Sequence, residues 1–398
     1  MAQLTILDWV LVVTGFIYLV AIAWLHRGLW RVWGRGRSSL PASANSASVT
    51  VLVAARDEEA SLPACLQALQ SQQYDGTLEI IVVDDRSCDD TPNIVRRFAD
   101  GWPALRLVEV VEQRLRCPKK NALAHGIEVS SGELLLFTDA DCQPPPHWVR
   151  SMVRGFDDGV GMVAGYAAAQ AGQRWIHSLL ALDNLAVSAM GAGSMGMGAP
   201  LSCSGRNLAY RRRVYDEVGG YSSVGDLMGG DDVYMMRLIG QRTSWSIAYN
   251  ADPESAVTSN ASSGRLTDVI HQKLRHASKA AHYGGAARLL GVCIYAFHLS
   301  LVAGLYMVAA GSATGGGIVI FSVWSLRWVA DGSLLWHFAS RFTRHEGRLL
   351  RWMPALEVSY LPYILLGVPL GGLGLFRWKG STTPLIRGQS FKERRVME

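Results

Sequence analysis

The chain has 398 residues, of which 49% are hydrophobic and 18% charged, and its formal net charge is +5. It is too apolar for an ordinary soluble domain, in which about 25% of residues are charged, and the composition also disfavours disorder, collagen and coiled coil. Much of the arginine excess flanks apolar stretches, where lipid headgroups explain it as well as nucleic acid would, so no nucleic acid is expected as a partner. The 6 cysteines are scattered without a C-x-x-C pair, which argues against a zinc site or a disulfide framework.

The N-terminal segment reads as a membrane anchor. Residues 9–25 form an uncharged apolar run of about the length that crosses a bilayer, and the arginines between Arg27 and Arg37 follow it. A cleaved signal peptide would carry its positive charge before the apolar run. The positive-inside rule therefore predicts an anchor over residues 1–33 with the following chain in the cytoplasm, joined by a small and polar linker at 34–48.

Residues 49–262 show a different pattern, in which short β-rich runs alternate with helix-like segments. The runs VTVLVAA, LEIIVVDD, LRLVEVV and ELLLFTDAD lack a polar face, as expected of strands covered on both sides. Residues 245–249 are a plausible late strand. The fold class predicted is α/β, a mostly parallel sheet with helices on both faces.

The C-terminal third returns to membrane-like sequence. Residues 263–288 form a basic amphipathic segment expected at the membrane surface, and a C-terminal transmembrane region is predicted over 289–376. That region has two clear apolar spans and a third, residues 355–376, broken by prolines and glycines. In the second span Arg327 and Asp331 are four residues apart and could pair.

For the C-terminal tail, the charge rule and the number of membrane spans predict different sides of the membrane. Residues 377–398 carry six Lys and Arg, which favours a cytoplasmic tail, whereas a spanning third segment would leave the tail outside. A re-entrant segment would reconcile the two, and both arrangements stay open at this stage.

Carboxylates follow several predicted strands. Asp84 and Asp85 end the second run, and the fourth runs into Asp139 and Asp141. Ligands of open α/β sheets bind at the carboxyl ends of the strands, and two carboxylates there can hold a divalent cation that a nucleotide diphosphate completes. The alternative for each acidic turn is a helix cap.

Two further pairs carry possible chemistry. Asp231 and Asp232 follow a glycine-rich loop and precede a helix, so they are either a cap or a source of a general base. Lys119 and Lys120 open another helix and offer positive charge to a phosphate, although such pairs are often simply solvated.

Taken in order, the motifs VAARDEE, VVDD, PKKNAL, FTDAD, SCSGRNLAYRR, GGDD and HQKLRH resemble the membrane-bound family 2 glycosyltransferases of the GT-A fold. The resemblance covers residues 49 to about 280, and WKG at residues 378–380 also looks like the end of such enzymes. It implies an inverting, non-processive transfer of a hexose from a nucleotide-sugar donor, more readily UDP than GDP.

The same resemblance implies roles for particular residues. Asp232 would be the catalytic base, preceded by Asp231 where the family more often has Glu. A divalent cation, Mg²⁺ or Mn²⁺, would lie at Asp139 and Asp141. The residues implied near the nucleotide are Ala54, Arg56, Glu58, Asp84, Asp85, Lys119, Lys120, Asp139, Gln272 and Arg275. Among them Asp85, with Asp84 beside it, would read the uracil ring, and of the two lysines the spacing favours Lys119.

One departure from the family bears on the product. His276 stands where processive members have the Trp of Gln-x-x-Arg-Trp, so polysaccharide synthesis is doubtful. Two further functions stay open: a non-catalytic membrane scaffold, and a nucleotidyltransferase, although the latter would usually have a Gly-rich loop after its first strand.

The acceptor is predicted to be lipidic. Residues 175–197 are long, apolar and rich in Met, Gly and Ala, and form either simple core or the mouth of a site for a greasy acceptor. The expected location is an inner or plasma membrane with the α/β domain in the cytoplasm.

Overall fold

The computed structural model describes residues 5–35, 47–172, 174–260, 266–278, 285–311, 316–342, 344–373, 377–378 and 381–382. Most of the predicted linker, residues 379–380 of the WKG motif and nearly all of the basic tail lie outside these ranges. The chain divides into two compact units. The α/β unit comprises residues 21–261 and 331–352, and the helical unit comprises residues 1–20, 262–330 and 353–398.

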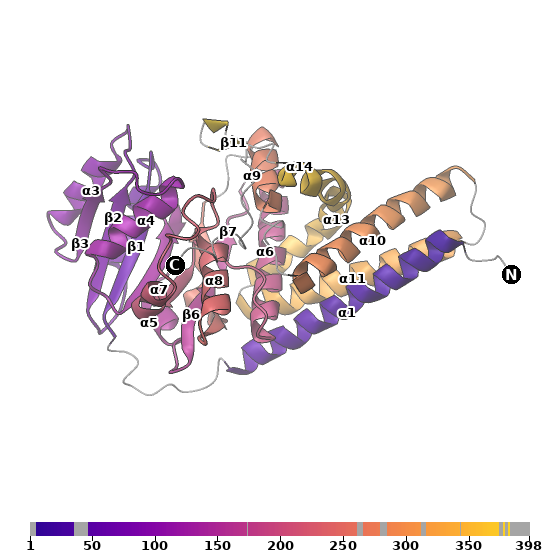
Figure 1. Ribbon diagram of the computed structural model, residues 1–398, viewed down its shortest axis with the longest axis horizontal. Helices are drawn as coiled ribbons and strands as arrows, with labels where there is room; N and C mark the ends of the chain where they lie inside the picture. Colours follow the sequence, from indigo (N-terminus) through magenta and orange to yellow (C-terminus); the bar gives the residue numbers. More distant parts are fainter. Residues whose placement is uncertain are drawn as a thin grey trace, which may run out of the picture. The chain divides into compact units, whose positions relative to one another are not determined.

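A seven-stranded sheet forms the centre of the α/β unit (Figure 1). The strand order is β3-β2-β1-β4-β8-β6-β9, and only β8 runs antiparallel to its two neighbours. The mostly parallel sheet predicted from the sequence is therefore confirmed, including the late strand. The strands are β1 (Val49–Ala55), β2 (Leu78–Asp84), β3 (Leu105–Glu109), β4 (Leu134–Asp139), β6 (Val160–Gly165), β8 (Leu208–Arg211) and β9 (Ser246–Asn250).

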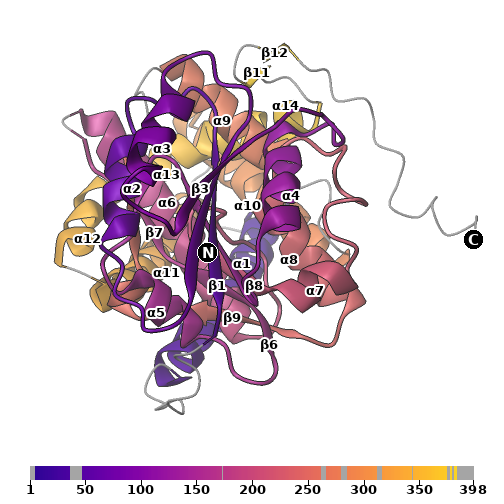
Figure 2. The ribbon, with the colours of Figure 1, turned by 90° about the vertical axis from the view of Figure 1, so that its left-hand side faces the viewer.

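Helices cover both faces of this sheet (Figure 2). On β1, Val51 and Val53 face one helical layer and Leu52 faces the other, because successive side chains of a strand point to opposite faces. Both faces are thus buried, which explains why the strand sequences lack a polar side. One layer is α2 (Leu62–Gln70), α3 (Thr91–Ala99) and α5 (Trp148–Val153), and the other is α4 (Pro118–Val129), α7 (Arg212–Glu217) and α8 (Asp231–Arg242).

The strand register brings the acidic motifs to one edge. Ala54 pairs with Asp139 across β1 and β4, and Ala55 pairs with Asp84 across β1 and β2. The three strands therefore end at the same level. A small second sheet, whose first strand follows β4 in the sequence, consists of β5 (Cys142–Gln143), β7 (Ala167–Ala169) and β10 (Val257–Ser259).

The long apolar segment at residues 175–197 is a helix, α6 (Trp175–Gly196), of which twelve residues are buried. Glycines let it approach the second half of α1 (Ile6–Arg35), because a Cβ on Gly28 would overlap the backbone oxygen of Gly193. Much of α6 is therefore packing surface. Trp175 and Val187 stay exposed, with 59% and 40% of their surface accessible.

Residues 331–352 join the α/β unit through polar contacts. The hydroxyl of Tyr166 donates to Glu346 at 2.8 Å, and Nε of Arg341 donates to the carbonyl of Ala251 at 2.9 Å. The compact unit is thus larger than the stretch 49–262 that the sequence pattern marks out.

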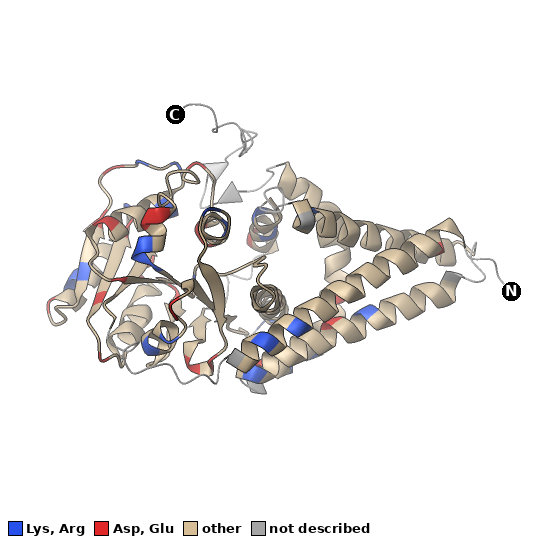
Figure 3. Cartoon of the chain, turned by 60° about the horizontal axis from the view of Figure 1, so that its bottom comes forward, with Lys and Arg blue, Asp and Glu red and all other residues tan. Residues whose placement is uncertain are grey.

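In the part of the chain that the structure describes, four helices are long and apolar enough to cross a membrane: residues 6–34, 287–309, 317–342 and 346–372. They carry few charged residues over most of their length (Figure 3). The fourth is interrupted, because α13 (Met353–Pro362) passes into a π-helical turn at Tyr363–Gly367 before α14 (Val368–Gly372). Pro362, which lacks a backbone N–H, stands at this break. The second and third of these apolar stretches lie on α10 (Gly285–Ala309) and α11 (Gly316–Phe342). The shorter helices are α9 (Leu266–Ser278), before α10, and α12 (Arg344–Arg348), after α11.

A buried ion pair joins two of these apolar helices within the helical unit. Nη2 of Arg327 on α11 lies 2.6 Å from the carboxylate of Glu357 on α13, and the two side chains are 2% and 3% exposed. The guanidinium also lies over the ring of Phe297, 5.9 Å from its centroid. Glu357 is thus a partner for Arg327 that the sequence pattern did not indicate.

Candidate active site

Lys119 lies among the carboxylates at the carboxyl edge of the sheet, which we call the acidic edge. Its ammonium lies 2.6 Å from Asp139 and 3.2 Å from Asp231, which come from the end of β4 and the start of α8. Burial would lower the pKa of Lys119, but Asp139, Asp231 and Asp232 together raise it well above its ordinary value. The lysine therefore stays positively charged. It connects Asp139, which is 20 residues away in the sequence, with Asp231, which is more than 100 residues away.

Asp139 and Asp141 have the oxygen chemistry that Mg²⁺ or Mn²⁺ requires. Burial and the charge of Asp139 raise the pKa of the Asp141 carboxyl, so a cation there would relieve both penalties. Among the described residues no group of three His, Cys, Asp or Glu side chains is arranged to hold a metal ion, and so a cation at this pair would need further ligands from the substrate. The residues fit a metal that a diphosphate completes.

Asp231 and Asp232 form the first turn of α8 but have different surroundings. Asp231 is 9% exposed and pairs with Lys119, whereas Asp232 accepts from the backbone N–H of Gly205 at 3.1 Å and of Val233 at 2.7 Å. A side chain at Gly205 would displace the Asp231 carboxylate, because a Cβ there would lie 2.9 Å from one of its oxygens. The backbone donors fix the orientation of the Asp232 carboxylate.

Lys120 does not reach this site. Its side chain is completely buried, and the ammonium donates to the carbonyls of Val224 and Leu227, both at 2.8 Å. It also lies over the ring of Tyr234. The prediction that Lys120 approaches the nucleotide is corrected accordingly: adjacent helical residues point about 100° apart, and here the second lysine stabilises the loop before α8.

The loop after β1 is fastened to the loop after β2. Asp57 accepts from the N–H of Cys88 at 2.7 Å, the N–H of Glu58 donates to Thr91 at 2.8 Å, and Glu59 accepts from the N–H of Asp90. The acidic residues of this loop thus satisfy backbone donors, as expected of capping residues. The Glu58 carboxylate itself accepts from Ser61 at 2.7 Å.

Asp84 and Asp85 end β2 beside this loop. Asp84 accepts from the N–H of Ser87 through one oxygen, and its other oxygen is buried without a hydrogen-bond partner among the described residues. A buried acceptor of this kind is costly unless a ligand donor satisfies it. Asp85 is also buried and pairs with Arg56, at 3.8 Å, and with Arg86. Ala54 lies one residue before the end of β1.

Gln272 and Arg275 lie on α9, in the helical unit. Within that unit α9 packs on α14, where Gly371 approaches the backbone of Leu274. Their predicted contact with a diphosphate remains a prediction.

Two arginines were not singled out by the sequence pattern as individual residues. Arg206 donates to Ser259 at 2.6 Å and to Asn184, and its charge acts on Asp141 in the direction that lowers the pKa. Arg86 contacts Asp85 directly. The signal for Arg206 was its place in the motif SCSGRNLAYRR, whereas nothing in the local pattern indicated Arg86.

Known proteins are similar to this chain in sequence and in fold. The family model described as glycosyl transferase family 2 matches residues 50–219, which hold Lys119, Asp139 and Asp141 but end before Asp231 and Asp232. Residues 50–219 therefore match a family 2 glycosyltransferase domain. Its fold is also that of a mannosyltransferase from Pyrobaculum calidifontis, whose structure was solved with GDP-Man and Mn²⁺ (22% identity, TM-score 0.56, covering 89% of this chain and 99% of that one).

Two curated relatives of the family 2 domain illustrate its range. Glycosyltransferase AglE of Haloferax volcanii is 34% identical over 119 residues, which are 29% of this chain and 38% of the relative. An undecaprenyl-phosphate 4-deoxy-4-formamido-L-arabinose transferase of Pseudomonas syringae is 29% identical over 173 residues, or 42% and 48% of the two chains. The match thus spans less than half the length of either relative.

Proposed function

We propose that the protein is an inverting glycosyltransferase that moves a hexose from a UDP-sugar to a hydroxyl of a membrane-associated lipid. The observation that carries the proposal is the convergence of Asp139, Lys119 and Asp231 at the carboxyl edge of the sheet, with Asp232 beside them. In a family 2 domain this edge would bind the donor.

The transfer step assigns a role to each side chain. The acceptor oxygen attacks the anomeric carbon in line, the bond from that carbon to the diphosphate breaks, and its electron pair leaves with UDP. Asp232 takes the proton of the acceptor hydroxyl. Its backbone hydrogen bonds to Gly205 and Val233 would hold it in place, while Asp231 positions Lys119.

The leaving diphosphate gains negative charge, which cations must neutralise. Asp139 and Asp141 would hold Mg²⁺ or Mn²⁺, which would supply that neutralisation when bound. Lys119 and, on α9, Arg275 with Gln272 are the proposed protein donors to the phosphates. The mannosyltransferase of the same fold, which binds Mn²⁺, supports the choice of cation.

A lipidic acceptor is supported by the membrane helices and by the relative named as an undecaprenyl-phosphate transferase. The arginines that follow the apolar part of α1 favour a cytoplasmic α/β unit. A polysaccharide synthase remains the alternative, as does a scaffold without activity.

The test is release of UDP by the purified full chain, given UDP-glucose, UDP-galactose or UDP-N-acetylglucosamine with a membrane lipid extract. We expect release that requires both the lipid and Mg²⁺ or Mn²⁺. A ladder of products from one donor would instead identify a polysaccharide synthase, and no turnover of any nucleotide sugar would favour the scaffold.

A further inference from the structure

The ammonium of Lys119 is the direct counter-ion of two carboxylates at the acidic edge. It lies 2.6 Å from Oδ1 of Asp139 and 3.2 Å from Oδ2 of Asp231. The three side chains are partly buried, with 26%, 31% and 12% of their surfaces exposed for Lys119, Asp139 and Asp231. Water therefore screens these contacts less than it would screen an ion pair on the surface.

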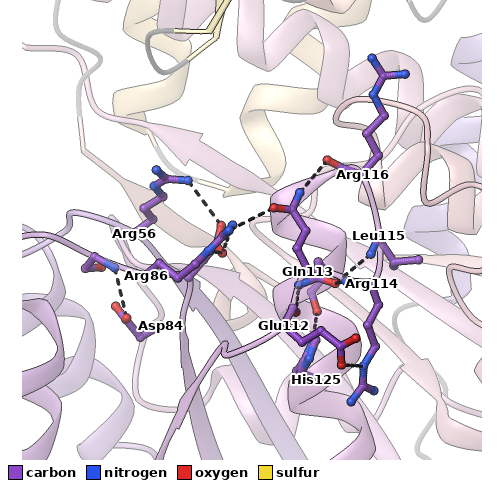
Figure 4. Close-up of polar contacts among 12 residues, drawn as sticks. Arg56, Asp84, Arg86, Glu112, Gln113, Arg114, Leu115, Arg116 and His125 are labelled. Carbon is purple, nitrogen blue, oxygen red and sulfur yellow. Dashed lines mark hydrogen bonds and ion pairs between the residues drawn. The ribbon is translucent and has the colours of Figure 1, made fainter.

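The backbone that carries Lys119 is held in place by the loop before α4 (Figure 4). Asn121, in the first turn of this helix, accepts from the N–H of Arg114 at 2.8 Å and from the N–H of Leu115 at 3.0 Å. Its amide group donates to the carbonyl of Glu112 at 3.0 Å. The helix start is thus fixed, whereas the lysine has a flexible four-carbon stem, so its ammonium can change partners by side-chain rotation alone.

A divalent cation at Asp139 has to share this carboxylate with the ammonium. Asp139 and Asp141 are the proposed ligands of Mg²⁺ or Mn²⁺, and Lys119 already donates to Oδ1 of Asp139. Because metal–oxygen distances are about 2.0 to 2.6 Å, a cation on the same carboxylate would lie close to the ammonium. Like charges at short range in a partly buried site repel each other, and so the lysine opposes binding of the cation.

A nucleotide diphosphate relieves this repulsion because it offers the ammonium another anion. Phosphate oxygens accept charge-assisted hydrogen bonds from lysine. When the ammonium contacts a phosphate, its hold on Asp139 weakens and the cation meets less repulsion there. Since the coupling between two ligands is reciprocal, the cation and the nucleotide strengthen each other's binding by the same factor.

We infer that Lys119 makes binding of the divalent cation depend on the nucleotide. Without a diphosphate the ammonium and the cation compete for Asp139, and with a diphosphate each has an anion of its own. The protein thus takes up the cation together with the donor and releases it with UDP. The inference rests on the proposed function and adds to it a regulation of the same site.

The experiment is titration of Mn²⁺ into the full-length protein in detergent, with the electron paramagnetic resonance signal of free Mn²⁺ as the readout. It is done with and without saturating UDP, and a protein-free titration corrects for Mn²⁺ that UDP binds in solution. Wild type should bind Mn²⁺ about tenfold or more tightly when UDP is present. Lys119→Met should bind Mn²⁺ alone about tenfold or more tightly than wild type, and should gain correspondingly less from UDP.

Two further variants separate the contact of Lys119 from the general charge of the site. Lys119→Gln is a second neutral variant and should behave as Lys119→Met does. The matched control is Arg114→Gln, because Arg114 lies on the loop before α4 but pairs with Glu112 and Glu128. Loss of this exposed charge should change the affinity for Mn²⁺ less than about threefold.

The inference and the proposed function fail in different ways. Equal affinity of wild type for Mn²⁺ with and without UDP would overturn the inference and leave the transferase proposal standing. So would Lys119 variants that bind Mn²⁺ alone no more tightly than wild type, or an equal gain in Arg114→Gln. A wild type that binds no Mn²⁺ even with UDP would overturn the inference together with the cation of the proposed function.

Discussion

The ammonium of Lys119 lies 2.6 Å from the carboxylate of Asp139. This contact ties the N-terminal turn of α4 to the end of β4, and the same ammonium reaches Asp231 on α8 at 3.2 Å. One lysine thus neutralises part of an acidic cluster that would otherwise repel itself and an incoming diphosphate.

Lys119→Met is expected to weaken UDP binding about tenfold or more, because a charge-assisted hydrogen bond contributes about 1.5 to 3 kcal/mol. Titration of UDP into the purified variant measures the loss. Lys120→Met is the comparison, since its ammonium bonds carbonyls of the loop before α8. It should lower thermal stability. A UDP affinity that falls equally in both variants, at equal thermal stability, would contradict the different roles of the two lysines.

Mn²⁺ binding is expected to weaken as pH falls, because the pKa of Asp141 is raised by burial and by Asp139. The folded protein keeps this proton at pH values where the unfolded chain, with an ordinary pKa near 3.8, has lost it. The carboxyl therefore destabilises the metal-free fold as pH rises from that value through the folded pKa, and Mn²⁺ restores the stability.

Thermal unfolding with and without Mn²⁺ at a series of pH values from about 4 upward tests this. In wild type, the stabilisation by Mn²⁺ should grow with pH. Asp141→Asn should show less stabilisation and little dependence on pH. If the variant kept the full wild-type profile, Asp141 would not be a metal ligand.

Gly205→Ala is expected to lower sugar transfer about a hundredfold, because the added Cβ would lie 2.9 Å from a carboxylate oxygen of Asp231 and displace the side chain that contacts Lys119. Steady-state UDP release measures it. The matched control is Gly240→Ala on α8, where a Cβ meets only Ile247 at an ordinary 3.8 Å. Full activity in both variants would show that the turn does not position the site.

The strands and the acidic residues at their ends could be predicted because each is marked by a pattern within a short stretch of sequence. A strand buried on both faces needs an unbroken apolar run, and Asp84 and Asp139 stand where two such runs stop. The adjacency of those ends follows from parallel pairing, which the alternation of elements implied.

The features that could not be predicted from the sequence depend on tertiary contacts. The spacing of Lys119 and Lys120 favoured the first only weakly, and their different directions became plain only from the loop at residues 224–227 that encloses Lys120. Glu357 could not be assigned to Arg327, because the two residues are 30 positions apart in the sequence and lie on different helices. The left-handed backbone of Arg86, with φ at 59°, likewise has no sequence signal.

Substitutions of Arg327 and Glu357 are expected to have strongly non-additive effects on the free energy of unfolding. Arg327→Met or Glu357→Gln alone should lower the free energy of unfolding by about 3 to 5 kcal/mol, because each leaves a buried charge without its partner. Replacing both with Met should recover most of that loss. Denaturant unfolding in detergent measures the cycle, and additive losses would mean that the pair does not act as a unit.

The most direct test is transfer of labelled sugar from the UDP-sugar to membrane lipid by wild type and by Asp232→Asn, with Asp216→Asn, on the separate helix α7, as the control. If Asp232 is the general base, its variant should transfer about 10² to 10⁴ times more slowly while UDP binds as tightly as to wild type, and the control should be unchanged. Transfer at the wild-type rate by Asp232→Asn would contradict the account.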